Sequence, residues 1–176
     1  IAAGSGVTTV IVMGNSTDGG QFGVKIRALT VDCSGNQNCI GIDNEVAEEG
    51  SMVEDVIINN APIGLKIHIG GTLADNSGPY RNITIQYPSC STNCGSATNG
   101  VFIVGNNGGQ IVRGLDNITV AACNTTAHAG IGINVARASV RITNSTISCS
   151  STGIYVGCTA AHAASGDCRT TDATSS

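Results

Sequence analysis

A four-residue phrase recurs five times along the chain, at intervals of 27, 27, 35 and 27 residues. In most copies a small or polar residue is followed by an apolar residue, by Thr or Ile, and then by Ile or Val. The copies are residues 28–31, 55–58, 82–85, 117–120 and 144–147. A fixed period of this size is typical of a solenoid, in which each repeat buries its apolar face by stacking on its neighbours.

A second phrase answers each copy of the first, and in both phrases apolar residues fall at alternate positions. The second phrase occupies residues 39–42, 64–67, 100–103, 130–133 and 153–156. Alternation is the period of a strand, and no window shows the 3.6-residue period of an amphipathic helix. A propeller blade needs about 40 residues, which is longer than most of these intervals. A coil of parallel strands explains the constant phrase, because equivalent positions stack at the strand spacing of roughly 4.8 Å.

Each coil can be divided into three short strands. In the segment 23–45 these are residues 24–26, a corner at 27–28, residues 29–31, and residues 40–42 after a loop. This pattern resembles the right-handed parallel β-helix proteins of the pectate-lyase-like superfamily. The resemblance implies an all-β solenoid of about six to seven turns, stabilised by disulfides. We assign the β-helix to residues 1–157, with the repeat itself over about 7–157, and a disulfide-closed loop with a polar tail to residues 158–176.

Three asparagines occupy the corner position of the first phrase: Asn82, Asn117 and Asn144. Asn tolerates the left-handed backbone that a sharp corner needs, and it can bond to the matching residue above and below. The family that the chain resembles is known for such asparagine ladders. We expect the ladder to be broken in the two earlier turns, where the corner residues are Ala28 and Asp55.

The residues one position earlier are Arg27, Glu54, Arg81 and Asp116. Their charge alternates in sign from one turn to the next, which predicts ion pairs between turns. Exposed pairs contribute little stability, on the order of 0–1 kcal/mol each, so they mainly favour correct register.

Charge is sparse, and no class of partner follows from it. Charged residues make up 11% of the chain, and the formal net charge is −4. The eight Lys and Arg residues are spread along the sequence, so we expect no cationic patch and no nucleic-acid partner. No apolar run approaches the length that spans a membrane, and we expect no membrane insertion.

The eight cysteines fall into four close pairs. Three pairs bracket loops, and the fourth would meet by stacking of adjacent turns: Cys33 with Cys39, Cys90 with Cys94, Cys158 with Cys168, and Cys123 with Cys149. Zinc ligation by the first two pairs is the alternative, although their spacing is not that of zinc knuckles. Disulfides predict an extracellular, secreted or cell-surface protein, and the sequence predicts neither a metal nor another cofactor.

Five Asn-X-Ser/Thr sequons are candidate N-glycosylation sites: Asn15, Asn82, Asn117, Asn124 and Asn144. Three of them coincide with the corner ladder. An asparagine that points inward within a ladder cannot carry a sugar, so occupancy depends on which way the ladder faces.

The sequence shows no complete catalytic set. Pectate lyases, which belong to the superfamily that the chain resembles, use calcium held by clustered acids together with a basic side chain. Here the tightest acidic group is Asp43, Glu45, Glu48 and Glu49 in one loop, and we interpret it as solvated. The paired Asp, Gly-His-Gly and Arg-X-Lys motifs of the polygalacturonase branch are absent. Whether the chain is an enzyme is uncertain, and the balance is against it.

Lys66 and His68 point outward on one strand and, with Arg81, are the candidate carbohydrate-binding residues. The leading prediction is nevertheless an extracellular structural or adhesive β-helix that self-associates through its open ends. The first strand at Thr8–Met13 follows only a short lead, and no amphipathic helix precedes it to cap the edge. The alternative is a carbohydrate-active or carbohydrate-binding β-helix for acidic polysaccharide. A third hypothesis is ice or glycan binding by the Thr column of residues 30, 84, 119 and 146.

Overall fold

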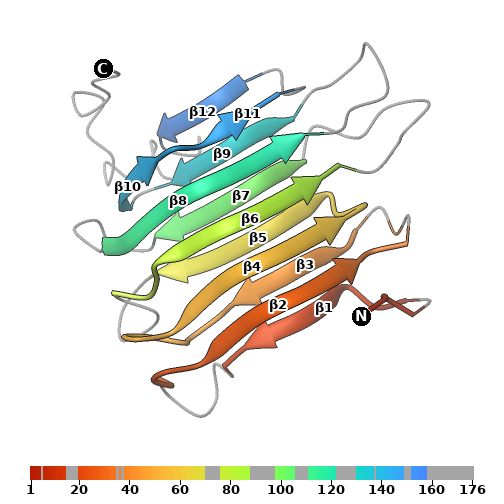
Figure 1. The fold of residues 1–176 in the computed structure, drawn as a ribbon, viewed down its shortest axis with the longest axis horizontal. Coiled ribbons are helices and arrows are strands. Elements are labelled where there is room, and N and C mark those ends of the chain that lie inside the picture. Colours follow the sequence, from red (N-terminus) through yellow and green to blue (C-terminus); the bar gives the residue numbers. More distant parts are fainter. Residues whose placement is uncertain are drawn as a thin grey trace, which may run out of the picture.

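A computed structural model describes most of the chain, and every element in the described part is a strand (Figure 1). The described residues are 1–4, 6–14, 20–34, 36, 38–69, 76–87, 98–105, 111–121, 130–136, 138–148 and 152–157. The predicted cysteine pairs other than Cys33 and Cys39, and the sequons Asn15 and Asn124, lie outside these residues.

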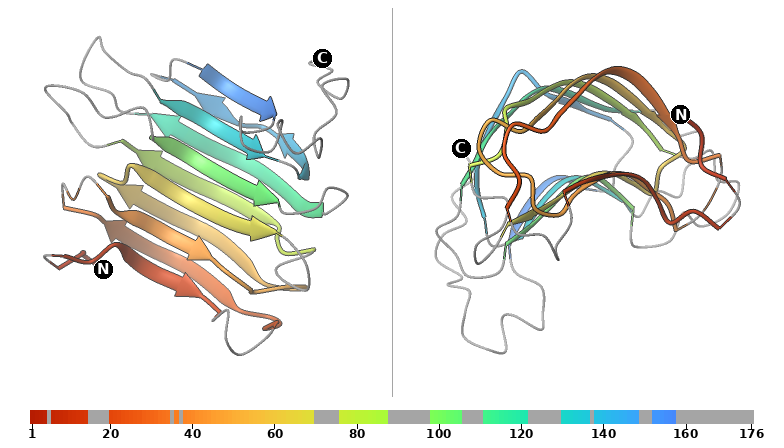
Figure 2. Two further views of the ribbon diagram at one scale, coloured as in Figure 1. Left: turned by 180° about the vertical axis from the view of Figure 1, so that it is seen from behind. Right: turned by 90° about the horizontal axis from the view of Figure 1, so that it is seen from below.

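The strands form two sheets, and successive strands alternate between them up to β10. Sheet A contains β2 (Lys25–Asp32), β4 (Met52–Asn59), β6 (Tyr80–Gln86), β8 (Ile111–Ala121) and β10 (Ser139–Thr143), with the short β11 (Thr146–Ile147) also paired to β8. Sheet B contains β1 (Thr9–Met13), β3 (Ile40–Asn44), β5 (Ile63–Ile69), β7 (Asn99–Gly105), β9 (Ile131–Ala136) and β12 (Thr152–Gly157). All the pairings are parallel. Seen along the stack, the sheets form two curved layers that face each other (Figure 2).

The register of sheet A is the one that the first phrase predicts. Thr30 pairs with Ile57, Ile57 with Thr84, Thr84 with Thr119, and Thr119 with Thr146. The corner residue of every copy has a positive φ between 52° and 56°. The corner lies inside a continuous strand in β2, β4, β6 and β8, so two of the three expected strands per turn are one bent strand.

The expected register of sheet B is wrong by two residues in two of its five copies. The strand pairing aligns glycines, and these are Gly41, Gly64, Gly100, Gly132 and Gly153. The phrase had instead placed Cys39 and Gly130 in that column. A two-residue slip keeps every side chain on its own face, so alternation alone cannot detect it.

The glycine column is required by close packing between the sheets. A Cβ atom on Gly64 would lie 2.6 Å from Cγ2 of Ile85 in sheet A and 2.7 Å from the carbonyl oxygen of Gly100. Gly41 and Gly100 meet the same two kinds of neighbour at 2.5–2.8 Å. Gly153, in the last described strand, has no atom within 4 Å of such a Cβ.

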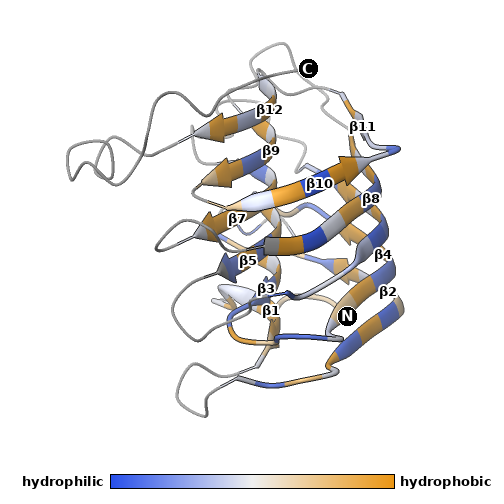
Figure 3. Cartoon of the chain, turned by 90° about the vertical axis from the view of Figure 1, so that its left-hand side faces the viewer, coloured by the Kyte–Doolittle hydropathy of each residue, from blue (hydrophilic) through white to orange (hydrophobic). Residues whose placement is uncertain are grey.

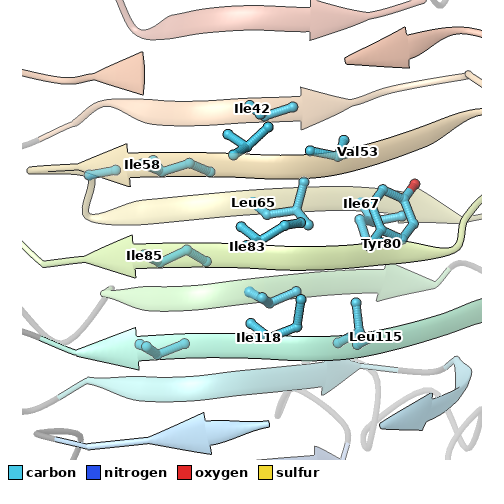
Figure 4. Packing of buried hydrophobic residues seen from close by; sticks show 14 of the residues in the cluster. Ile42, Val53, Ile58, Leu65, Ile67, Tyr80, Ile83, Ile85, Leu115 and Ile118 are labelled. Atoms are coloured by element: carbon cyan, nitrogen blue, oxygen red, sulfur yellow. The ribbon is translucent and has the colours of Figure 1, made fainter. Parts of the chain in front are cut away.

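Aliphatic side chains fill the space between the sheets in rows that run along the stack (Figure 4). One row of sheet A includes Ile58 and Ile85, while Leu65 of sheet B lies beside Ile83 and Ile67 lies beside Tyr80, all fully buried. The outward-facing residues of each sheet also line up in straight columns along the stack. Successive residues of a column lie on neighbouring strands, about one strand spacing apart.

Candidate functional site

The outer face of sheet B carries a cluster of Asp43, Lys66 and His68. Oδ1 of Asp43 lies 2.9 Å from Nε2 of His68, and Oδ2 lies 3.6 Å from Nζ of Lys66. The Asp43 side chain is only 6% exposed, whereas Lys66 and His68 are 21% and 36% exposed. Asp43 sits opposite Lys66 in the strand pairing, which holds the cluster in place. Lys66 and His68 therefore share one carboxylate, which offsets the positive charge of Lys66 toward an outside anion.

The same column continues along the sheet with uncharged residues. Lys66 pairs with Phe102, Phe102 with Asn134, and Asn134 with Tyr155. Tyr155 is 43% exposed, and Nδ2 of Asn134 donates to Oδ1 of Asn99 at 3.1 Å. This column therefore alternates aromatic rings with an amide, beside one ion cluster.

Arg81, the third candidate carbohydrate-binding residue, lies on sheet A rather than beside Lys66 and His68. Its Nε is 2.6 Å from Oε1 of Glu54, and Oε2 of Glu54 is 3.0 Å from Nε of Arg27. Glu54 is buried to 11% side-chain exposure between the two guanidinium groups. The predicted ion pairs are thus present between the adjacent strands β2, β4 and β6.

The fourth residue of this column, Asp116, is held by hydrogen bonds. Oγ1 of Thr143 donates to Oδ1 of Asp116 at 2.7 Å, and Nδ2 of Asn144 donates to the same oxygen at 2.9 Å. These two bonds, followed by the nearby charges of Arg81 and Arg141, lower the pKa of Asp116 below its usual value. The two positive charges of this column, on Arg27 and Arg81, are therefore offset by the two negative charges on Glu54 and Asp116.

The corner ladder faces outward, and it includes Asp55. Nδ2 of Asn82 donates to Oδ1 of Asp55, and Nδ2 of Asn117 donates to Oδ1 of Asn82, both at 2.9 Å. The expected break at Asp55 is wrong, because a carboxylate accepts the bond that an amide would accept. Asn144 departs from the ladder, since its amide bonds to Asp116 instead of Asn117.

The three described sequon asparagines are exposed on the molecular surface, and each Nδ2 is the donor in one of these bonds. Their threonines, Thr84, Thr119 and Thr146, lie in the predicted outward column, which Ile57 interrupts with 44% exposure. Sequon occupancy and ice binding both remain predictions.

A disulfide joins Cys33 and Cys39, as their spacing predicted. A bond of this kind persists in oxidising compartments. The part of the chain with described structure contains no helix of the length and apolarity needed to cross a membrane. In that same part, no three or more His, Cys, Asp or Glu side chains are grouped to hold a metal ion.

Sequence reasoning missed a buried polar network that joins the sheets. Nδ2 of Asn44 in β3 donates to Oη of Tyr80 in β6 at 2.7 Å, and Oη of Tyr80 donates to Oγ of Ser77 at 2.8 Å. Burial raises the pKa of Tyr80 to about 12, against the smaller opposite effect of its two hydrogen bonds. The Asn44 amide also bridges the backbone of Ala47 with two bonds. The side chains of this network are buried and bonded to one another, so they are not accessible to a ligand.

The chain matches no protein-family model, no curated protein and no solved structure.

Proposed function

We propose that this chain is a right-handed parallel β-helix, similar to the pectate-lyase-like proteins, and that it is an extracellular structural or adhesive protein whose copies stack end to end. Two observations support this fold. Strands that are separated by one repeat pair in parallel, and the corner residue of each repeat has a positive φ. The disulfide supports an oxidising, extracellular setting.

The observation that carries the stacking proposal is the exposure of β12. Ile154 and Val156 are 49% and 52% exposed, whereas their partners in β9, Ile133 and Val135, are buried to 0% and 1%. Within the described residues no strand pairs with the outer edge of β12 or of β1. These side chains occupy positions equivalent to core residues, and among the described residues no further strand pairs beyond them.

The columns of sheet B give the contact that a second copy would make. Continued by one turn, they place Ile154 of one copy opposite Ile11 of the next, and Val156 opposite Met13. Tyr155 falls opposite Val12, which is 48% exposed at the other end. Unpaired strand edges with apolar residues favour edge-to-edge pairing, and a head-to-tail contact of this kind does not close, so it yields filaments.

The test is the molar mass of the full chain in solution, measured by light scattering over a range of concentrations. We expect concentration-dependent assembly in the wild type and its loss in Val156→Lys. Ile57→Lys is the matched control, because Ile57 is an exposed apolar strand residue away from both ends. A wild type that is monomeric at every concentration, or equal assembly of the two variants, contradicts the proposal.

The alternative, a carbohydrate site for acidic polysaccharide on sheet B, has one observation in its favour. Phe102 and Tyr155 flank Asn134 in the column that also contains Val12, Asp43 and Lys66. Rings of this kind pack against sugars, and amides bond to their hydroxyl groups. Asp43, however, offsets the positive charge of Lys66 and contacts His68, so the geometry supports the structural function better.

A further inference from the structure

The edge of sheet A at β2 is covered along only part of its length. The N–H of Ala3 donates to the carbonyl oxygen of Asp32 at 2.8 Å, and the N–H of Asp32 donates to the carbonyl oxygen of Ile1 at 2.9 Å. Ala2 and Asp32 thereby form a parallel bridge. Among the described residues, no segment pairs with this edge over Lys25–Leu29. The edge therefore accepts a parallel segment at one end of β2 and has no described partner along the rest.

The core is less covered where this pairing stops. Val31, beside the paired residues, is 0% exposed. Leu29 and Ile26 are only half-buried, although they pack against the core. Their partners in β4, Val56 and Val53, are exposed by 1% and 0%. Figure 3 shows β2 at one end of the stack, with hydrophobic and hydrophilic residues alternating along it. An unpaired edge beside a half-buried apolar row favours pairing with another strand.

The charges at this edge indicate which kind of strand fits. Arg27 is the outermost described residue of the column in which Arg81 lies between Glu54 and Asp116. Glu54 contacts Arg27 from one side at 3.0 Å, and 58% of the Arg27 side chain is exposed. Lys25 is also exposed, and no described carboxylate lies within ion-pair distance of it. Since opposite charges on adjacent strands stabilise a sheet, an acidic residue fits the open side of Arg27.

We propose that the edge of β2 at Lys25–Leu29 binds an extended peptide segment of a partner protein by parallel β-strand addition. In this mode of recognition main-chain hydrogen bonds give the affinity and side chains select the partner. The partner segment carries apolar residues opposite Ile26 and Leu29, and an acidic residue opposite Arg27. Opposite Ala28, which has φ of 54°, it carries Asn, Asp or Gly, because these residues tolerate the left-handed corner.

The chain itself contains two segments with this pattern. Residues 53–56 and 115–118 each consist of an apolar residue, an acidic residue, Asp or Asn, and an apolar residue. The first of these segments pairs in parallel with β2 on its other edge, where Glu54 contacts Arg27. A partner segment with the same pattern would repeat this arrangement on the open edge of β2.

The β2 edge of a second copy is a poorer occupant. Pairing two copies through β2 would gather Lys25 and Arg27 of both copies at one seam. Like charges on adjacent strands destabilise a sheet, whereas an acidic segment supplies the opposite charge.

In the proposed stack the same segment would bridge two copies, and this part of the inference rests on the proposed function. The columns of sheet A, continued by one turn, place Ile147 of one copy opposite Ile1 of the next. The strands β10 of one copy and β2 of the next then lie about two strand spacings apart, roughly 10 Å. A gap of this width holds one strand, so the partner segment should promote assembly.

The experiment uses the full chain carrying Val156→Lys, which should not stack, and a synthetic peptide with the sequence of residues 115–121. Hydrogen exchange measured by mass spectrometry locates the bound peptide. We expect exchange to slow in residues 25–29 and to stay unchanged in β8 and β10. The same peptide with Asp116→Lys should bind about threefold to tenfold more weakly. Arg27→Gln in the protein should reduce this preference. Arg113→Gln is the matched control, because Arg113 is exposed on β8 away from the edge.

Unchanged exchange in residues 25–29 at every peptide concentration overturns the inference, as does equal affinity for the two peptides. Slow exchange there in a Val156→Lys dimer without peptide also overturns it, because a second copy would then be the occupant. In the wild type, the peptide should raise the molar mass and slow exchange in β10 as well. A wild type that stays monomeric while the peptide protects residues 25–29 supports the edge site and contradicts stacking, so the two proposals fail separately.

Discussion

Asn117 donates a 2.9 Å side-chain hydrogen bond to Asn82, although 35 residues separate them in the sequence. Both residues have φ of 54° and occupy the same corner on adjacent strands. The bond links β6 to β8 at the point where each bent strand changes direction, so the corner asparagines stabilise both the local backbone and the register.

Replacing Asn117 should therefore reveal two separable effects. Asn117→Ala loses the side-chain bond to Asn82. It also places at the corner a residue that tolerates the left-handed backbone conformation less well than asparagine does, so we expect a loss of about 1–2 kcal/mol in the free energy of unfolding. Asn117→Gly loses only the bond and should be less destabilised. Urea denaturation measures both. If the alanine and glycine variants are equally stable, backbone conformation plays no part at this corner.

The glycine column should tolerate no side chain inside the stack. Gly64→Ala forces Cβ against Ile85 and the Gly100 backbone, and we expect it to destabilise the fold by about 1–3 kcal/mol. Gly153→Ala is the matched control, because nothing lies within 4 Å of the added atom. Equal stabilities of the two variants in urea would show that the sheets do not approach as closely as described.

Tyr80 should ionise well above the ordinary pKa of a tyrosine. Its pKa of about 12 exceeds the ordinary 10.0, so the folded protein holds this proton more tightly than the unfolded chain. The contribution to stability is complete below pH 10 and is lost as pH rises from 10 to 12. The tyrosinate absorbance due to Tyr80, measured as the difference between wild type and Tyr80→Phe, should be absent near pH 10 in the folded protein. A tyrosinate signal from Tyr80 in the folded protein near pH 10 would contradict this.

Tyr80→Phe removes the hydroxyl that connects Asn44 with Ser77. The buried amide and hydroxyl lose a partner, so we expect a loss of about 1–3 kcal/mol in the free energy of unfolding. The alkaline loss of stability should also become shallower in this variant. A variant as stable as wild type in urea would argue against a role for the network.

Asp116 should titrate below its ordinary pKa of 3.8, chiefly because Thr143 and Asn144 donate to its carboxylate. A depressed pKa contributes stability above the unfolded value, and that contribution is lost as pH falls through the folded value. We expect Thr143→Val to raise the pKa of Asp116 measured by carbon NMR. Thr119→Val is the control, since Thr119 lies on the same sheet and donates no bond to Asp116. An unchanged pKa in Thr143→Val would contradict the assignment.

The sequence predicts sheet A more accurately than sheet B, for a physical reason. The corner needs a special backbone conformation, so Asn82 and Asn117 mark one fixed position in each turn. Sheet B has only alternation, which is unchanged by a slip of two residues, and the offset at Gly41 and Gly132 went undetected. The signal that could have corrected it was the glycine in every copy.

The functional surfaces were harder to predict because they depend on which strands are neighbours. Charge alternation correctly indicated the pairing of Arg27, Glu54 and Arg81. Arg113 and Arg141 lie outside the repeated phrases, and an irregularity in the pairing of β8 with β10 follows directly after Val112 and Val140. Their relative placement, like the contact of Asn44 with Tyr80, follows only from the three-dimensional register.

Electron microscopy of the full chain in negative stain tests the proposed stacking most directly. We predict filaments whose axial repeat corresponds to about six strand spacings of roughly 4.8 Å, one for each of the six strands of sheet B. Val156→Lys should abolish them and Ile57→Lys should not. Separate particles of uniform size in the wild-type protein, at concentrations where folding is complete, would contradict end-to-end stacking.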